Sequence, residues 1–181
     1  EELLAKRHSE MEFLTQLLDG TKVQPYKLPV NMNIELRKYQ LDGVSWMAFL
    51  AKYQLHGILC DDMGLGKTLQ SIALLSGKHF ERDERWKQTQ SADAAPAPSL
   101  VICPPTLTGH WVHEIRQYSP NLRPMLYAGH PAERTRLQKQ IQKHDVVVMS
   151  YDVVRNDIAA LARSAWFYCI LDEGHVRSEE H

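Results

Sequence analysis

The feature that most constrains this 181-residue chain is a glycine-rich turn between an apolar run and a helical pattern. The apolar run spans residues 56–59, and the turn at 61–68 reads Asp-Asp-Met-Gly-Leu-Gly-Lys-Thr. A strand that leads through such a turn into a helix lets successive backbone N–H groups converge on a phosphate. Lys67 can place its ammonium on β- and γ-phosphate oxygens, and the Thr68 hydroxyl can ligate Mg²⁺. The sequence therefore predicts a phosphate-binding loop for a nucleoside triphosphate.

This loop departs from the usual G-x-x-x-x-G-K-[ST] pattern at its first position, which is Asp61. The close approach of backbone to phosphate then depends on Gly64 and Gly66. The candidate nucleotide-binding residues of the loop are Asp62, Met63, Gly64, Leu65, Gly66, Lys67 and Thr68.

Two adjacent acids, Asp172 and Glu173, follow a second apolar run at 166–171. Hydrolysis of ATP needs one carboxylate that holds Mg²⁺ or its water shell and a second that orients the attacking water. We assign Asp172 to the metal and Glu173 to the water, and with Lys67 these are the candidate catalytic residues. The alternative is that the two acids only begin a solvated loop, and the phosphate-binding loop earlier in the chain argues against it.

The balance of charge and the cysteine content limit the classes of partner. The formal net charge of −1 provides no overall attraction for nucleic acid, so any DNA contact has to come from local patches. Cys60, Cys103 and Cys169 have no C-x-x-C spacing and fall on or beside predicted strands, so we expect reduced core residues rather than a zinc site. We expect neither a membrane span nor a signal peptide.

Helical and strand patterns alternate along most of the chain. The spacing predicts a helix over 1–18, an extended connector over 21–33 and a helix over 36–53. The predicted strands that follow are 57–60, 100–103, 124–127, 146–150 and 167–171. The predicted helices between them are 67–75, 107–118, 132–142 and 153–162. This alternation indicates an α/β fold with a mainly parallel sheet flanked by helices, and residues 81–99 are expected to be a flexible surface insertion.

Five motifs, in the same order, resemble the first half of the motor of Swi/Snf-type ATPases, which are helicase-like translocases on double-stranded DNA. The motifs are Leu-Arg-Lys-Tyr-Gln at 36–40, the loop at 61–68, Cys-Pro-Pro-Thr-Leu at 103–107 with Trp111, Ser-Tyr at 150–151, and Asp-Glu-Gly-His at 172–175. The resemblance implies a RecA-like P-loop lobe over 34–181, after an N-terminal helix and connector over 1–33. It is greatest, at 104–111 and 150–157, to the branch of the family that removes TATA-box-binding protein from DNA.

The resemblance also implies roles for single residues, with ATP and Mg²⁺ as cofactors. Gln40 would read the adenine edge, since an amide can donate to a ring nitrogen and accept from the exocyclic amine. The alternative for Gln40 is an amphipathic-helix residue satisfied by solvent. Arg37 would assist at the base or sugar, or form a surface ion pair. His175 would couple the nucleotide state to the DNA contacts.

Candidate DNA contacts lie in the loops near 104–111 and 150–156, where backbone N–H groups and side chains could grip the phosphates of one strand without reading bases. The candidate side chains are Thr106, Thr108, His110, Ser150 and Arg155. The alternative is a structural role, and we expect at least one threonine to cap a helix. We expect Trp111 to lie in the core.

The sequence therefore predicts the N-terminal lobe of a nuclear, DNA-dependent ATPase that displaces a DNA-bound protein. Double-stranded DNA, TATA-box-binding protein and a second motor lobe are the expected partners. Residues 176–181 match the family weakly, and we expect the second lobe, with its γ-phosphate arginine, to lie outside this sequence. Since such an arginine contributes about 10³–10⁵ in rate, this lobe alone should hydrolyse ATP hardly at all.

An alternative is a nucleotide-gated protein-interaction module without translocation. A metabolic P-loop kinase fits poorly, because nothing forms an obvious lid.

Overall fold

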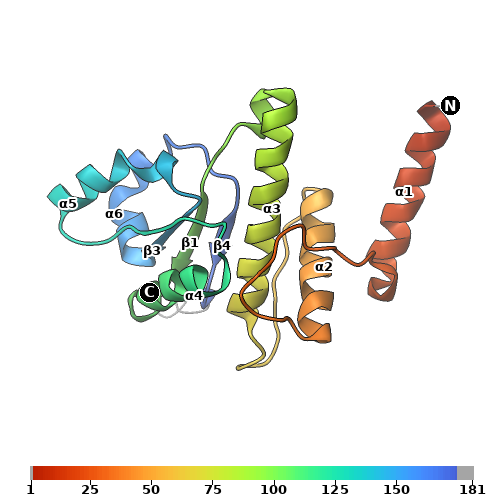
Figure 1. Ribbon diagram of the computed structural model, residues 1–181, viewed down its shortest axis with the longest axis horizontal. Coiled ribbons are helices and arrows are strands. Elements are labelled where there is room, and N and C mark those ends of the chain that lie inside the picture. The colour runs from red at the N-terminus through yellow and green to blue at the C-terminus, as the bar shows by residue number, and fades with distance from the viewer. Residues whose placement is uncertain (1, 175–181) are drawn as a thin grey trace. The chain divides into compact units, whose positions relative to one another are not determined.

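The computed structural model describes residues 2–174, and the proposed coupling residue His175 lies outside them (Figure 1). The chain divides into two compact units. The first contains Glu1–Leu28 and Glu35–Leu74, and the second contains Pro29–Ile34 and Leu75–His181. Each unit is described by itself.

The first unit is built on helices α1 (Glu2–Leu18) and α2 (Lys38–Lys52) and the first turns of α3 (Lys67–Thr89). Phe13 of α1 packs against Phe49 and Tyr53, with ring centroids 6.1 and 4.6 Å apart. After α1, a 3₁₀ turn, η1 (Gly20–Lys22), is capped by Asp19, which accepts from the Thr21 N–H. The two helices predicted before the glycine-rich loop are thus confirmed.

The strand predicted at 57–60 is wrong, because residues 55–62 form neither strand nor helix. Ile58 is 80% exposed, and Gly57 is also exposed. A parallel strand is normally covered on both faces, and a glycine within it weakens pairing. An apolar run this short therefore did not distinguish a strand from an extended segment.

The second unit contains a four-stranded sheet in the order β2-β3-β1-β4, with every neighbouring pair parallel. The strands are β1 (Ser99–Cys103), β2 (Pro124–Leu126), β3 (Val146–Ser150) and β4 (Cys169–Leu171). β1 and β3 are buried along their whole length, as expected for central parallel strands. The predicted α/β fold with a mainly parallel sheet is confirmed.

Helices and short turns precede and connect these strands. They are η2 (Ala92–Ala94), η3 (Pro105–Leu107), α4 (Thr108–Tyr118), α5 (Pro131–Gln138), η4 (Ile141–Lys143) and α6 (Tyr151–Leu161). Alternate strand residues form one core cluster with side chains of α6. Its buried members are Leu100, Ile102, Met125, Tyr127, Ile141, Val147, Met149, Tyr151 and Leu161. This cluster fixes the start of α6 against the sheet.

The insertion predicted at 81–99 differs in the structure, since α3 continues without interruption to Thr89. Residues 81–88 are mostly good helix formers and include no glycine or proline, which explains the extension. The rest of the segment is attached to the helix: Arg82 Nε donates to Ala95 O at 2.8 Å, and Arg85 pairs with Asp93 at 2.8 Å. Asp83, Arg85 and Lys87 are exposed, so the charged side chains of this part of α3 mostly face solvent.

Candidate nucleotide-binding and catalytic site

The glycine-rich loop has the backbone that its sequence pattern requires. Gly64 has φ +84° and Gly66 has φ +75°, in the left-handed region that glycine adopts without strain. A Cβ at Gly64 would have no neighbour within 4 Å, whereas one at Gly66 would lie 2.5 Å from Gln40 Nε2. The turn leads directly into α3 at Lys67. The side of the turn to which a Cβ at Gly64 would point is open.

We expect Gly66→Ala to weaken nucleotide binding at least tenfold, because a left-handed alanine costs about 1–2 kcal/mol before any movement of Gln40. The measurement is titration with a fluorescent ATP analogue in the presence of Mg²⁺. Gly109→Ala is the matched control, since its Cβ in α4 would meet nothing within 4 Å. Equal affinities of Gly66→Ala and the wild type would contradict the assignment of the loop.

Lys67 bends back over this loop. Its Nζ donates to Asp61 O at 2.7 Å and to Asp62 O at 3.0 Å, so the ammonium lies against the backbone that the sequence pattern assigns to phosphate. Thr68 follows in the first turn of α3 and is half-buried. Met63 is 93% exposed at the tip of the loop. The positive charge of Lys67 therefore lies beside the backbone at the start of the loop.

Gln40 is buried and bonded at both ends of its amide. Its Oε1 accepts from the Arg37 N–H at 2.9 Å, and its Nε2 donates to Leu65 O at 3.3 Å. The alternative in which solvent satisfies Gln40 is therefore wrong. Arg37 is exposed and has no carboxylate partner within residues 2–174. The amide of Gln40 joins the start of α2 to the glycine-rich loop.

Sequence reasoning missed Gln70, which is fully buried one turn into α3. Its Nε2 donates to Asp61 Oδ2 at 3.1 Å, so the residue that departs from the usual loop pattern has a structural partner. A Cβ at Gly43 would lie 2.0 Å from Gln70 Oε1, which shows how closely α2 approaches this side chain. The available signal was a glutamine three and four residues before the apolar Ala73 and Leu74, on the same face of the helix. Gln70 and Asp61 fix the entry to the loop.

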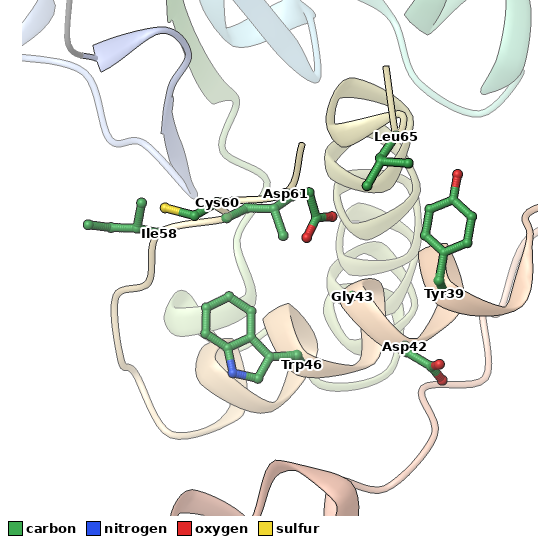
Figure 2. A pocket seen from close by; sticks show the side chains of 9 residues that line it. Tyr39, Asp42, Gly43, Trp46, Ile58, Cys60, Asp61 and Leu65 are labelled. Carbon is green, nitrogen blue, oxygen red and sulfur yellow. The ribbon is translucent and has the colours of Figure 1, made fainter. Parts of the chain in front are cut away.

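A pocket of about 720 Å³ lies beside the loop, within the size range of small-molecule sites (Figure 2). Figure 2 shows side chains of α2, including Trp46 and Tyr39, on one side and the segment from Ile58 to Asp61 on the other. The lining residues are Tyr39, Asp42, Gly43, Trp46, Ile58, Leu59, Cys60, Asp61 and Leu65. An aromatic, partly acidic wall of this kind fits the base or sugar of a nucleotide better than its phosphates.

In the second unit, Asp172 directly follows β4 and is held at three points. Its N–H donates to Ile102 O at 2.8 Å, which extends the ladder between β4 and β1. Its Oδ2 accepts from Trp111 Nε1 at 2.8 Å, and its carbonyl accepts from Tyr151 Oη at 2.8 Å. These bonds leave Oδ1 as the oxygen with which Asp172 could hold a cation. The predicted core position of Trp111 is confirmed by its exposure of 2%.

The next residue, Glu173, is exposed and has φ +52°. A left-handed backbone is unusual for a long side chain, and strain of this kind clusters at functional sites. The assignment of Glu173 to the attacking water remains a prediction that this strain supports.

Only one of the three cysteines lies in the core as expected. Cys103 is buried, whereas Cys60 and Cys169 are exposed. Burial, together with the negative charge of Asp172, raises the pKa of the Cys103 thiol to about 12. Cys60 was placed in the core because of the predicted strand at 57–60, and the absence of that strand explains the error.

Iodoacetamide at neutral pH should therefore modify Cys60 and leave Cys103 largely unmodified. A pKa near 12, against about 8.5 for an ordinary thiol, lowers the thiolate fraction by about 10³-fold. Peptide mapping by mass spectrometry measures both rates in one sample, and modification in denaturant provides the control. Equal rates in the folded protein would contradict the buried position of Cys103.

The candidate DNA contacts follow β1 and β3, whose last residues Cys103 and Ser150 are paired in register. Both loops therefore leave the same edge of the sheet. The predicted threonine cap is wrong: Leu107 is the N-cap of α4, and Thr108 Oγ1 donates to Pro105 O at 2.9 Å. The 3₁₀ turn η3 leads straight into α4 and leaves no extended cap residue. Ser150 instead caps α6.

Three of the candidate DNA contacts are exposed, and Ser150 is not. Thr106 and His110 are exposed, and His110 Nε2 lies 3.1 Å from Glu114 Oε1. Arg155 is exposed and pairs with Asp152 at 2.7 Å. Ser150 is buried, and its Oγ accepts from the Val153 N–H at 3.4 Å, which favours its structural alternative.

Within the described residues, no helix is long and apolar enough to cross a membrane.

The mainly parallel sheet flanked by helices and the glycine-rich loop together define the class of protein, which is a RecA-like P-loop lobe. A family model described as the SNF2-related domain matches residues 39–181, and the chain belongs to this family. The Swi/Snf resemblance predicted from the motifs is thereby confirmed. A solved structure described as the Sulfolobus solfataricus SWI2/SNF2 ATPase core in complex with dsDNA aligns with a TM-score of 0.68 and 31% identity. The alignment covers 87% of this chain and 30% of that one.

Curated relatives extend the similarity through the N-terminal residues. TATA-binding protein-associated factor 172 of Homo sapiens is 57% identical over 97% of this chain. TATA-binding protein-associated factor MOT1 of Saccharomyces cerevisiae is 52% identical, also over 97% of this chain. The alignments cover 10% and 9% of those proteins, so the chain spans about a tenth of their length.

Proposed function

We propose that this chain is the N-terminal lobe of an ATP-dependent translocase on double-stranded DNA, acting in the nucleus to displace a DNA-bound protein. The observation that carries the proposal is the glycine-rich loop, in which Gly64 and Gly66 have positive φ and the Lys67 ammonium donates to the carbonyl oxygens of Asp61 and Asp62. Such a loop at a helix start is built to hold phosphate.

Each proposed role follows from the chemistry of the side chain. Lys67 neutralises charge on the β- and γ-phosphates, and the amides from Asp62 to Gly66 orient them. Gln40 and Arg37 lie at the start of α2 beside this loop and orient the base and sugar. Thr68 and Asp172 are the residues that would hold Mg²⁺, which when bound shields the phosphate charge. Glu173 orients the attacking water.

The DNA role is supported by the loops that follow β1 and β3. They leave one edge of the sheet and present Thr106, His110 and Arg155 at the surface. Contacts of this type bind phosphate without reading sequence, as translocation requires. The relatives are called TATA-binding protein-associated factors, and we propose TATA-box-binding protein as the displaced protein. A second motor lobe completes the proposed enzyme.

ATP turnover with and without double-stranded DNA tests this function, in a protein that carries this chain together with a second motor lobe. Stimulation of turnover by the duplex, with a smaller effect of single strands, is expected for a translocase. Turnover that does not respond to DNA would contradict it. That result would favour the nucleotide-gated protein-interaction module, in which ATP occupancy switches a protein contact.

A further inference from the structure

Two buried aromatic side chains from different helices hold the acid to which we assign the metal. Trp111 of α4 donates from Nε1 to Asp172 Oδ2, and Tyr151 of α6 donates from Oη to Asp172 O, each at 2.8 Å. Trp111 is 2% exposed and Tyr151 is 8% exposed. Buried Trp and Tyr normally find a partner for their polar atom. Here the indole N–H donates to one oxygen of the carboxylate, and the other oxygen is available to a cation.

Both aromatic residues lie in the first turn of a helix whose start carries candidate DNA contacts. Trp111 is three residues after Thr108, the first residue of α4, and Tyr151 is the first residue of α6. The strand pairs Cys103–Ser150 and Ile102–Leu171 bring the carboxyl ends of β1, β3 and β4 to one edge of the sheet. The starts of α4 and α6 are therefore each joined to Asp172 through one side chain.

We propose that Trp111 and Tyr151 are positioning residues through which DNA contact at the starts of α4 and α6 changes the affinity of Asp172 for Mg²⁺. The proposal rests on the proposed function and names a regulation of the same site. Because each donor belongs to the first turn of its helix, a shift of either helix start displaces a group that donates a hydrogen bond to Asp172. The Trp111 bond orients the carboxylate itself, whereas the Tyr151 bond fixes the backbone that carries it.

Trp111→Phe tests the first link, because it keeps an aromatic ring and removes the N–H donor. The protein is the one with both motor lobes, and the measured quantity is the Mg²⁺ concentration for half-maximal binding of a fluorescent ATP analogue, with and without duplex DNA. We expect that concentration to rise about tenfold or more, as for loss of a hydrogen bond to a charged group. The difference in that Mg²⁺ concentration between the DNA-free and DNA-bound protein should also become smaller.

Trp166→Phe is the matched control, since the Trp166 indole donates to Leu161 O at 3.0 Å and contributes no bond to Asp172. Trp166→Phe should have the Mg²⁺ requirement of the wild type, both with and without DNA. Tyr151→Phe provides a second variant, with Tyr127→Phe as its control, because the Tyr127 hydroxyl donates to Asp157 instead. Tyr151→Phe should reduce the effect of DNA on the Mg²⁺ requirement, and Tyr127→Phe should not.

The outcomes separate this proposal from the proposed function. If DNA changes the Mg²⁺ requirement of the wild type, and changes it equally in Trp111→Phe and Tyr151→Phe, the positioning role is overturned and the DNA-dependent motor stands. If neither the Mg²⁺ requirement nor the turnover of the wild type responds to DNA, both proposals are overturned. A loss of coupling confined to Trp111→Phe and Tyr151→Phe supports the link through Asp172, since a purely structural role would not change the Mg²⁺ requirement selectively.

Discussion

Glu173→Gln is expected to reduce DNA-stimulated ATP turnover by about 10²–10⁴-fold, the usual contribution of a positioned general base. The substitution keeps the size of the side chain and removes the carboxylate that we assign to the attacking water. Nucleotide binding should persist, because the loop residues from Asp62 to Thr68 are unchanged. Steady-state turnover on duplex DNA, measured beside Mg²⁺-dependent nucleotide binding, separates the two effects.

The control for this variant is Glu84→Gln, the same chemical change on the exposed face of α3. Glu84 pairs with Lys87 at 2.7 Å on the surface, and such a pair contributes little. Turnover of Glu84→Gln should therefore equal that of the wild type. A Glu173→Gln protein that retains more than about a tenth of the wild-type turnover would contradict the assignment, since a general base contributes at least about 10²-fold.

The parts of the fold that could be predicted are those whose signal lies in one continuous segment. β1 and β3 are apolar at nearly every position and buried at every position, so their pattern admitted few alternatives. The run at 56–59 looked similar, but Ile58 is 80% exposed, and exposure is not visible in a short apolar run. The predicted end of α3 at residue 75 is too early, because the charged residues that follow indicate a solvated segment but are also good helix formers.

The candidate site also combines features that a local sequence pattern predicts with features that it does not. The backbone at Gly64 and Gly66 follows from the residue types alone, because a tight turn with positive φ favours glycine. The bond between Gln70 and Asp61 joins residues nine positions apart, and the bond between Trp111 and Asp172 joins residues 61 positions apart. No local pattern encodes such pairs, since the sheet and helices bring them together. Sequence reasoning therefore placed Trp111 in the core but missed its acceptor.

Asp157→Ala is expected to lower the free energy of unfolding by about 3–5 kcal/mol, the cost of breaking a buried ion pair from one side. Arg134 Nε and Nη2 donate to Asp157 Oδ2 and Oδ1 at 2.7 and 3.0 Å, and the Tyr127 hydroxyl donates to Oδ2 at 2.7 Å. The side chains of Arg134 and Asp157 are only 10% and 13% exposed. Removal of the carboxylate takes away the acceptor of the Tyr127 hydroxyl and of two guanidinium nitrogens, although Arg134 Nη1 still donates to Gly129 O at 2.7 Å. Urea unfolding followed by tryptophan fluorescence measures the loss.

Asp152→Ala, on the same helix, is the matched control. Asp152 and Arg155 form a surface pair at 2.7 Å with side chains 66% and 53% exposed, so this change should cost at most about 1 kcal/mol. Equal losses from Asp152→Ala and Asp157→Ala would contradict the buried network.

The same network makes a prediction for pH. The hydrogen bonds from Arg134, and then from Tyr127, lower the pKa of Asp157 in the folded state. A carboxyl group with a lowered folded pKa stabilises the fold above its unfolded pKa of about 3.9, and that stabilisation is lost as the pH falls below it. Between about pH 4 and pH 2, the wild type should therefore lose more stability than Asp157→Asn, which has no charge to lose at this position. Parallel stability curves for the two proteins over that range would show that Asp157 has an ordinary pKa in the fold.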